Sequence, residues 1–138
     1  MTSTTLCSAP SLTLSGSGLT VVNFCSPHQF DFDNGDALPP CSTERVKALS
    51  LGSADKTEEK TLPSGKRISL VSKVFILTEA ILGELKVLED DVQVDVVLVP
   101  FPLLQALQQG GYGLFFSKPV TVSVDRLSKK ASSTHFCV

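Results

Sequence analysis

Both histidines of the chain lie close in sequence to a cysteine, and this is the pattern with the clearest chemical meaning. Two residues separate Cys25 from His28, and Cys41 follows thirteen positions after His28. Zinc is commonly held by four Cys and His ligands, and a two-residue gap lets one loop supply two of them. These three residues are therefore a candidate zinc site. His135 and Cys137 form a second, shorter pair. No further pair has matching spacing, so zinc is the alternative interpretation and we expect no cofactor.

The sequence contains no recognisable pattern for nucleophilic or acid–base catalysis. There is no Gly-x-Ser-x-Gly motif, and residues 64–66 (Ser-Gly-Lys) lack the glycine spacing of a phosphate-binding loop. The adjacent acidic residues 89–91 are typical of a solvated turn. We therefore predict that the protein is not an enzyme.

Charge gives little support for nucleic-acid binding, which is a further alternative. The net charge is −2; residues 1–65 carry four basic and seven acidic groups, and residues 66–138 carry eight and seven. Neutralising a phosphate backbone requires a clear basic excess on one surface. The basic residues available for such a surface are Lys66, Arg67, Lys118, Arg126, Lys129 and Lys130.

The elements that must position these residues lie mostly in the second half of the chain, which is dense in aliphatic residues. Residues 66–77 predict a long strand that is buried on both faces near its end. Alternating valines predict strands at residues 92–98 and 120–124. Each has one acid on its polar face, which would suit an edge strand. In the first half, residues 19–25 predict a strand.

Helices are predicted in three segments. Thr43–Leu51 has a capping threonine at its start and Gly52 after its end. Residues 103–109 follow Pro102, which favours a helix start. Residues 78–88 are ambiguous between helix and strand, and the helical spacing of the leucines favours a helix that begins at about Thr78.

Together these elements predict an α+β, β-rich fold, in a single small domain with a mainly antiparallel sheet and two or three short helices. We expect a loosely structured N-terminal tail at residues 1–18, a domain at residues 19–127 and a polar C-terminal tail at residues 128–138. The Ser-, Glu- and Lys-rich residues 53–65 predict a mobile loop within the domain.

The leading functional prediction is protein interaction. The aliphatic half has more apolar residues than a small core needs, and self-association, most simply as a symmetric dimer, would cover the surplus. The residues expected at such a contact are Phe101, Leu103, Leu104, Phe115 and Phe116. An unidentified protein is the other expected partner. The composition would also suit a small viral accessory or matrix-like protein.

We expect a soluble intracellular protein. The first residues lack the basic and apolar regions of a secretory signal. The longest apolar runs are interrupted by charged residues well before the roughly 18 residues that a membrane span requires.

Overall fold

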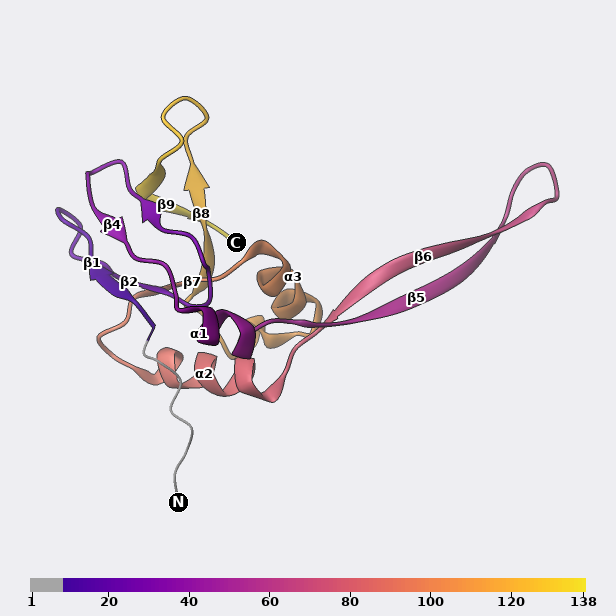
Figure 1. The fold of residues 1–138 in the computed structure, drawn as a ribbon, viewed down its shortest axis with the longest axis horizontal. Coiled ribbons are helices and arrows are strands. Elements are labelled where there is room, and N and C mark those ends of the chain that lie inside the picture. Colours follow the sequence, from indigo (N-terminus) through magenta and orange to yellow (C-terminus); the bar gives the residue numbers. More distant parts are fainter. Residues whose placement is uncertain (1–8) are drawn as a thin grey trace, which may run out of the picture.

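The computed structural model describes residues 9–138, and its centre is a five-stranded mixed sheet (Figure 1). The strand order is β1 (Ser11–Thr13), β2 (Thr20–Asn23), β7 (Val96–Leu98), β8 (Pro119–Val124) and β9 (Ala131–Cys137). The three inner strands β2, β7 and β8 run parallel to one another, and the edge strands β1 and β9 pair antiparallel with β2 and β8. Parallel strands need a crossover connection, and helix α3 (Phe101–Gln109) supplies the one between β7 and β8.

Two antiparallel hairpins lie outside this sheet. The small one consists of β3 (Phe30–Asp31) and β4 (Ala37–Leu38), and the long one of β5 (Gly52–Thr61) and β6 (Arg67–Ile76). The remaining elements are α1 (Thr43–Ala48), α2 (Glu79–Asp90) and a short 3₁₀ helix at Tyr112–Leu114. Four of the six strand pairings in residues 9–138 are antiparallel, which confirms the predicted β-rich α+β fold.

The two faces of the sheet are covered differently. Side chains alternate along a strand, so Val22 and Val97 point to one face while Val21 and Leu98 point to the other. The first face packs against the three helices, whose buried residues include Ile81, Leu85, Leu103, Leu104 and Leu107. The second face packs in a separate cluster with Leu14, which follows β1, with Phe32 and Leu38 of the β3–β4 hairpin, and with Ala131 at the start of β9.

The predicted helices are confirmed, and local capping explains where two of them begin. The Thr78 side chain accepts a hydrogen bond from the backbone N–H of Ile81, so the ambiguous segment is a helix that begins where Thr78 caps it. Helix α1 is capped by Ser42, one residue before the threonine that the sequence suggested. No helix in residues 9–138 is long and apolar enough to cross a membrane.

Two of the predicted strands occupy different positions from those expected. Strand β7 begins only at Val96, and it is the central strand of the sheet, flanked by β2 and β8. Strand β8 lies between β7 and β9, so neither β7 nor β8 is at an edge of the sheet. The Asp95 carboxylate does not guard an edge; it accepts a hydrogen bond of 2.9 Å from the backbone N–H of Thr20.

Three segments predicted without regular structure contain strands. Within the expected C-terminal tail, Ala131–Cys137 pairs with β8, because the turn after Val124 returns the chain along that strand. In the expected N-terminal tail, Ser11–Thr13 pairs with β2, while residues 1–8 lie outside the described residues. The prediction of a mobile loop at 53–65 is wrong for residues 53–61, which form most of β5 because β6 provides a paired strand.

Candidate functional site

The long hairpin, residues 52–76, projects from the domain and is called the arm below (Figure 1). Its two strands pair over ten residues each, from Gly52 opposite Ile76 to Thr61 opposite Arg67. A tight connection closes the far end, where the backbone N–H of Leu62 donates to the carbonyl of Lys66 over 2.7 Å. The prediction that β6 is buried near its end is wrong, since every residue of β6 is exposed.

One face of the arm carries a row of aliphatic side chains. The alternation along β6 places Ile68, Leu70, Val74 and Ile76 on the same face, and these four residues are called the apolar row. Their side chains are between 39% and 49% exposed. Large aliphatic residues at this spacing normally face a core. In the arm they face outward, which makes the row the most unusual surface of the described chain.

Charged residues line the other strand on the same face. Lys56, Glu58 and Lys60 of β5 lie opposite Ser72, Leu70 and Ile68. The ammonium of Lys56 lies 3.1 Å from the carboxylate of Glu58. Both side chains are exposed, so this ion pair contributes little stability. The arm is therefore an amphipathic ribbon, with an aliphatic strand beside a charged one.

The base of the arm has an apolar anchor to the domain. Phe75 lines a pocket of about 360 Å³ together with Val46, Leu49, Leu51 and Leu103. Beyond this base, strand β5 is exposed from Ser53 to Thr61. An isolated two-stranded hairpin is marginally stable in water. The outer part of the arm thus depends on its own pairing or on something that covers it.

A second apolar surface, at Tyr112, Phe115 and Phe116, contains part of the predicted interaction set. Phe115 is 70% exposed, and Phe116 is partly buried against Tyr112, with the two rings stacked at 6.3 Å. Phe101 is 61% exposed and borders a different pocket. Leu103 and Leu104 are buried, so the prediction that they lie at a contact surface is wrong. Helix α3 turns them toward the sheet, because residues at this spacing share its core face.

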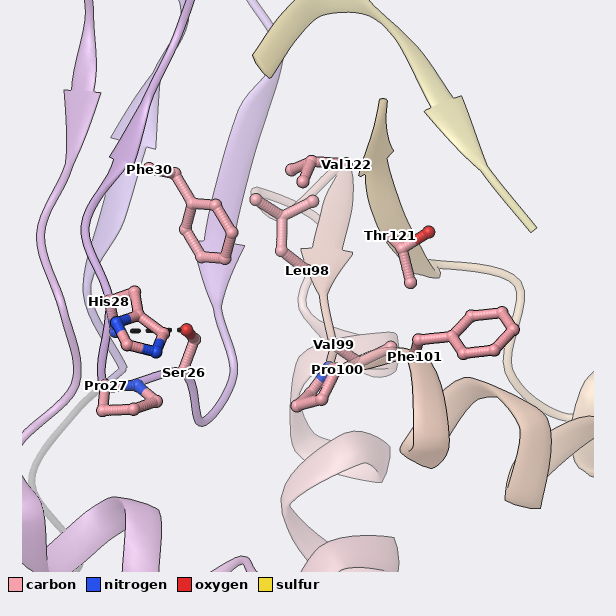
Figure 2. A pocket seen from close by; sticks show the side chains of 10 residues that line it. All are labelled: Ser26, Pro27, His28, Phe30, Leu98, Val99, Pro100, Phe101, Thr121 and Val122. Carbon is pink, nitrogen blue, oxygen red and sulfur yellow. Dashed lines mark hydrogen bonds between the residues drawn. The ribbon is translucent and has the colours of Figure 1, made fainter. Parts of the chain in front are cut away.

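The loop after β2, the carboxyl end of β7 and strand β8 border a cavity of about 430 Å³ (Figure 2). Its lining is mostly apolar, with Phe30, Leu98 and Phe101 among the larger side chains. His28 and Ser26 lie at its rim, and the hydroxyl of Ser26 accepts a hydrogen bond of 3.2 Å from the backbone N–H of His28. The cavity therefore places one histidine of the candidate zinc set beside apolar side chains.

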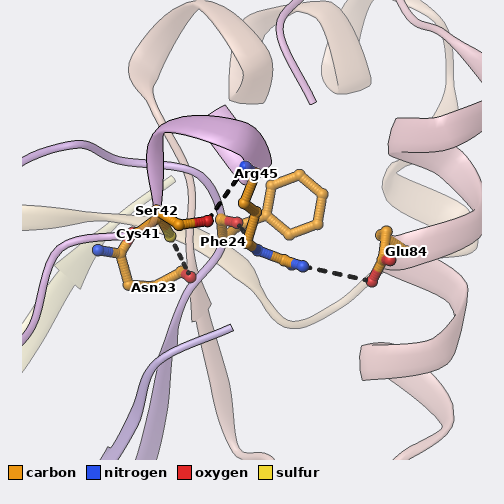
Figure 3. Close-up of polar contacts among 6 residues, drawn as sticks. All are labelled: Asn23, Phe24, Cys41, Ser42, Arg45 and Glu84. Carbon is orange, nitrogen blue, oxygen red and sulfur yellow. Dashed lines mark hydrogen bonds and ion pairs between the residues drawn. The ribbon is translucent and has the colours of Figure 1, made fainter. Parts of the chain in front are cut away.

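The two cysteines of that set have different surroundings: Cys41 lies in a buried polar network (Figure 3), and Cys25 packs in the apolar core. Cys25 and Cys41 are both buried free thiols, and Cys41 donates a hydrogen bond to the carbonyl of Asn23 over 3.1 Å. Burial raises the pKa of the Cys25 thiol from 9.0 to about 11, with a smaller contribution from Cys41. Burial also raises the pKa of Cys41, although the guanidinium of Arg45 opposes the shift.

These thiols are therefore held in the protonated form, which is neither nucleophilic nor a good metal ligand. Within residues 9–138 no group of three or more His, Cys, Asp or Glu side chains is arranged to hold a metal ion. His135, which forms the second pair with Cys137 in the sequence, lies on β9. Its Nδ1 atom is 2.8 Å from the hydroxyl oxygen of Thr134.

The basic residues proposed for nucleic acid do not form one surface. Lys66 and Arg67 lie at the far end of the arm, where Arg67 forms an ion pair with Glu59 at 3.1 Å. Lys118 donates to the backbone carbonyl of Asp91 over 2.7 Å and so fastens the end of α2. Arg126, Lys129 and Lys130 lie at the β8–β9 turn, away from the arm tip in Figure 1.

Comparison of the chain with protein-family models, with curated proteins and with solved structures gives no match. The site must therefore be judged on its own geometry. The sequence analysis predicted the strand but not the hairpin. The strand signal is the alternation of aliphatic residues at Ile68, Leu70, Val74 and Ile76. The sequence alone could not say that this row faces solvent.

Proposed function

We propose that the protein is a non-enzymatic interaction module that self-associates through the arm. The observation that carries the proposal is the apolar row, four large aliphatic side chains exposed along one face of a projecting hairpin. Contiguous exposed apolar surface on a small protein commonly marks a site of association. Covering it would contribute roughly 25 cal/mol for each Å² of apolar surface removed from water.

The marginal stability of a lone hairpin supports the same proposal. Few contacts hold the arm beyond its base, and the exposed ion pairs add little. A partner that packs on the arm would stabilise both the pairing of its strands and the exposed aliphatic groups. A second copy of the chain is the simplest partner, because a symmetric dimer uses the same surface twice.

The remaining chemistry of the described residues favours a non-enzymatic role. Cys25 and Cys41 are buried with raised pKa values, so they are poor nucleophiles. The carboxylate of Glu89 accepts hydrogen bonds from the backbone N–H groups of Ser117 and Lys118, which is a structural task. An intracellular location is part of the proposal, and the free thiols of Cys25, Cys41 and Cys137 support it.

The test is a native mass spectrum and a sedimentation series of the full chain and a Leu70→Asp/Val74→Asp double variant. We expect a dimer for the unchanged chain and a monomer for the double variant. Each copy of the variant would have to bury two carboxylates in the interface, and removing them from water is costly. Thr57→Asp on the opposite face of the arm is the matched control and should remain dimeric. Circular dichroism of each variant reports whether the domain stays folded.

A monomeric unchanged chain at all accessible concentrations would refute the proposal. If the chain is a dimer that Phe115→Asp separates and the arm variants do not, the second apolar surface is responsible and the arm is not.

A further inference from the structure

The two edges of the arm differ in a way that points to one mode of association. In the described residues β5 and β6 pair only with each other, so each has one free edge. Strand β5 carries five charged side chains, Asp55, Lys56, Glu58, Glu59 and Lys60. Strand β6 carries two, Arg67 and Lys73. Charged residues on an edge strand prevent pairing with other chains, so β5 is protected and β6 is not.

We propose that the β6 edges of two copies pair antiparallel about a two-fold axis, with Ser72 of one copy opposite Ser72 of the other. This inference rests on the proposed function and specifies the partner strand and the register. It would join two arms into a four-stranded sheet in which the β6 strands are central and the charged β5 strands form the outer edges.

The apolar row is self-complementary in this register. Antiparallel pairing about Ser72 places Ile68 opposite Ile76 of the second copy, and Leu70 opposite its Val74. Each of the four aliphatic side chains of the row therefore meets an aliphatic partner. Directly opposed side chains on one face of a sheet are the pairs that stabilise it most. On the other face, Lys73 lies opposite Val71 of the second copy, so no two like charges face each other.

Neighbouring registers lack this match. Centring the pair on Lys73 places two lysines in direct opposition, and centring it on Leu70 places Arg67 opposite Lys73. Like charges at directly opposed positions are destabilising. Centring it on Val71 avoids this repulsion, but it leaves Leu70 opposite Ser72 and only Ile68 and Val74 as an aliphatic pair of the row. The register about Ser72 is thus preferred on both packing and charge.

The geometry of the arm permits the pairing. The arm extends away from the domain along its length, so the β6 edge can be reached by a second chain (Figure 1). Val71, near the middle of the edge, is 65% exposed and lies opposite Thr57 within its own arm. A substitution at Val71 therefore changes the proposed contact and leaves the domain core untouched.

The experiment compares Val71→Lys with Val71→Glu by sedimentation equilibrium at low ionic strength. In the proposed register residue 71 lies opposite Lys73 of the second copy, twice in each dimer. Val71→Lys should raise the dimer dissociation constant roughly tenfold through like-charge repulsion, and Val71→Glu should leave it unchanged or lower it. The difference between the two variants should shrink at high salt.

The outcomes separate this inference from the proposed function. If both variants weaken the dimer equally, residue 71 faces itself, and the register about Ser72 is wrong. If neither variant changes a dimer that Leu70→Asp/Val74→Asp separates, the arm associates through its apolar face and β6 does not pair edge to edge. If the unchanged chain is monomeric, the proposed function and this inference both fail. Only weakening by Val71→Lys without weakening by Val71→Glu supports the register.

Discussion

The Nε atom of Arg45 donates a hydrogen bond of 2.7 Å to the backbone carbonyl oxygen of Phe24, and its guanidinium lies 5.5 Å from the centre of the Phe24 ring (Figure 3). Arg45 is 2% exposed, and its Nη1 atom lies 3.7 Å from the carboxylate of Glu84 on α2. One side chain thus links α1, the end of β2 and α2. It joins the end of β2 to the two helices that precede and follow the arm in the chain.

Arg45→Ala should lower the free energy of unfolding by about 2–4 kcal/mol, because it removes the hydrogen bond to Phe24 and leaves Glu84 without its cation. The aliphatic part of the arginine also packs in the core, and its loss adds to the effect. Lys47→Ala, on an exposed position of the same helix, is the control and should change stability by less than about 0.5 kcal/mol. Urea unfolding measures both; equal stability of the two variants would mean that the arginine network contributes nothing.

Leu103→Ala and Phe101→Ala should differ sharply, although both positions belong to the predicted interaction set. Leu103 is 1% exposed and Phe101 is 61% exposed. Truncating the buried leucine should cost about 2–5 kcal/mol, since it removes apolar contacts and leaves a cavity. Truncating the exposed phenylalanine should cost about 0.5 kcal/mol or less. Thermal unfolding of the two variants checks this, and a larger loss for Phe101→Ala would contradict the placement of α3.

Local signals in the sequence were sufficient for the helices and insufficient for the sheet. Thr78 and its neighbours specify a helix start within one turn, so the segment could be predicted from residues close together. The parallel pairing of Val21 with Val96 depends on residues that are far apart in the chain. Alternation at 92–98 indicates a strand and does not reveal which strands lie beside it.

The candidate site shows the same limit. The alternation of Ile68, Leu70, Val74 and Ile76 is a correct strand signal, and it normally implies a buried face. The charged composition of residues 53–61 argues for a loop, and only pairing with β6 makes this segment a strand. Burial and pairing are properties of the whole fold, so the sequence indicated the strand at 66–77, predicted it to be buried near its end, and pointed to none of its residues as a site.

Stability should fall at alkaline pH because of Cys25. Burial raises the pKa of its thiol from 9.0 to about 11 in the folded protein. Below pH 9 the thiol is protonated in both the folded and unfolded states and has no effect. Between pH 9 and 11 the unfolded state releases the proton and the folded state keeps it, so the free energy of unfolding decreases, by roughly 1–3 kcal/mol over this range.

Cys25→Ala isolates this contribution from other groups that titrate in the same range. The difference in unfolding free energy between the unchanged chain and this variant, measured in urea at pH 8, 9, 10 and 11, should narrow as pH rises. A difference that stays constant with pH would show that the thiol does not titrate as its burial implies.

The exposed Cys137 should react with iodoacetamide at pH 8 in the folded protein, while Cys25 and Cys41 should not.

Gly83→Ala should stabilise the protein, and Gly65→Ala should destabilise the arm. Gly83 lies within α2, and a Cβ atom built on it would meet nothing within 4 Å. Alanine there should raise the free energy of unfolding by about 1 kcal/mol, since glycine is the poorer helix former. Gly65 closes the arm with a φ of +88°, a conformation in which a side chain is strained by roughly 1–2 kcal/mol.

The effects of the two substitutions should also appear in different parts of the molecule. Gly83→Ala should raise the global unfolding temperature. Gly65→Ala should speed hydrogen exchange in β5 and β6 and leave the central sheet unchanged, because few contacts connect the outer arm to the domain. Faster exchange throughout the central sheet in Gly65→Ala would show that the arm and the domain unfold as one unit.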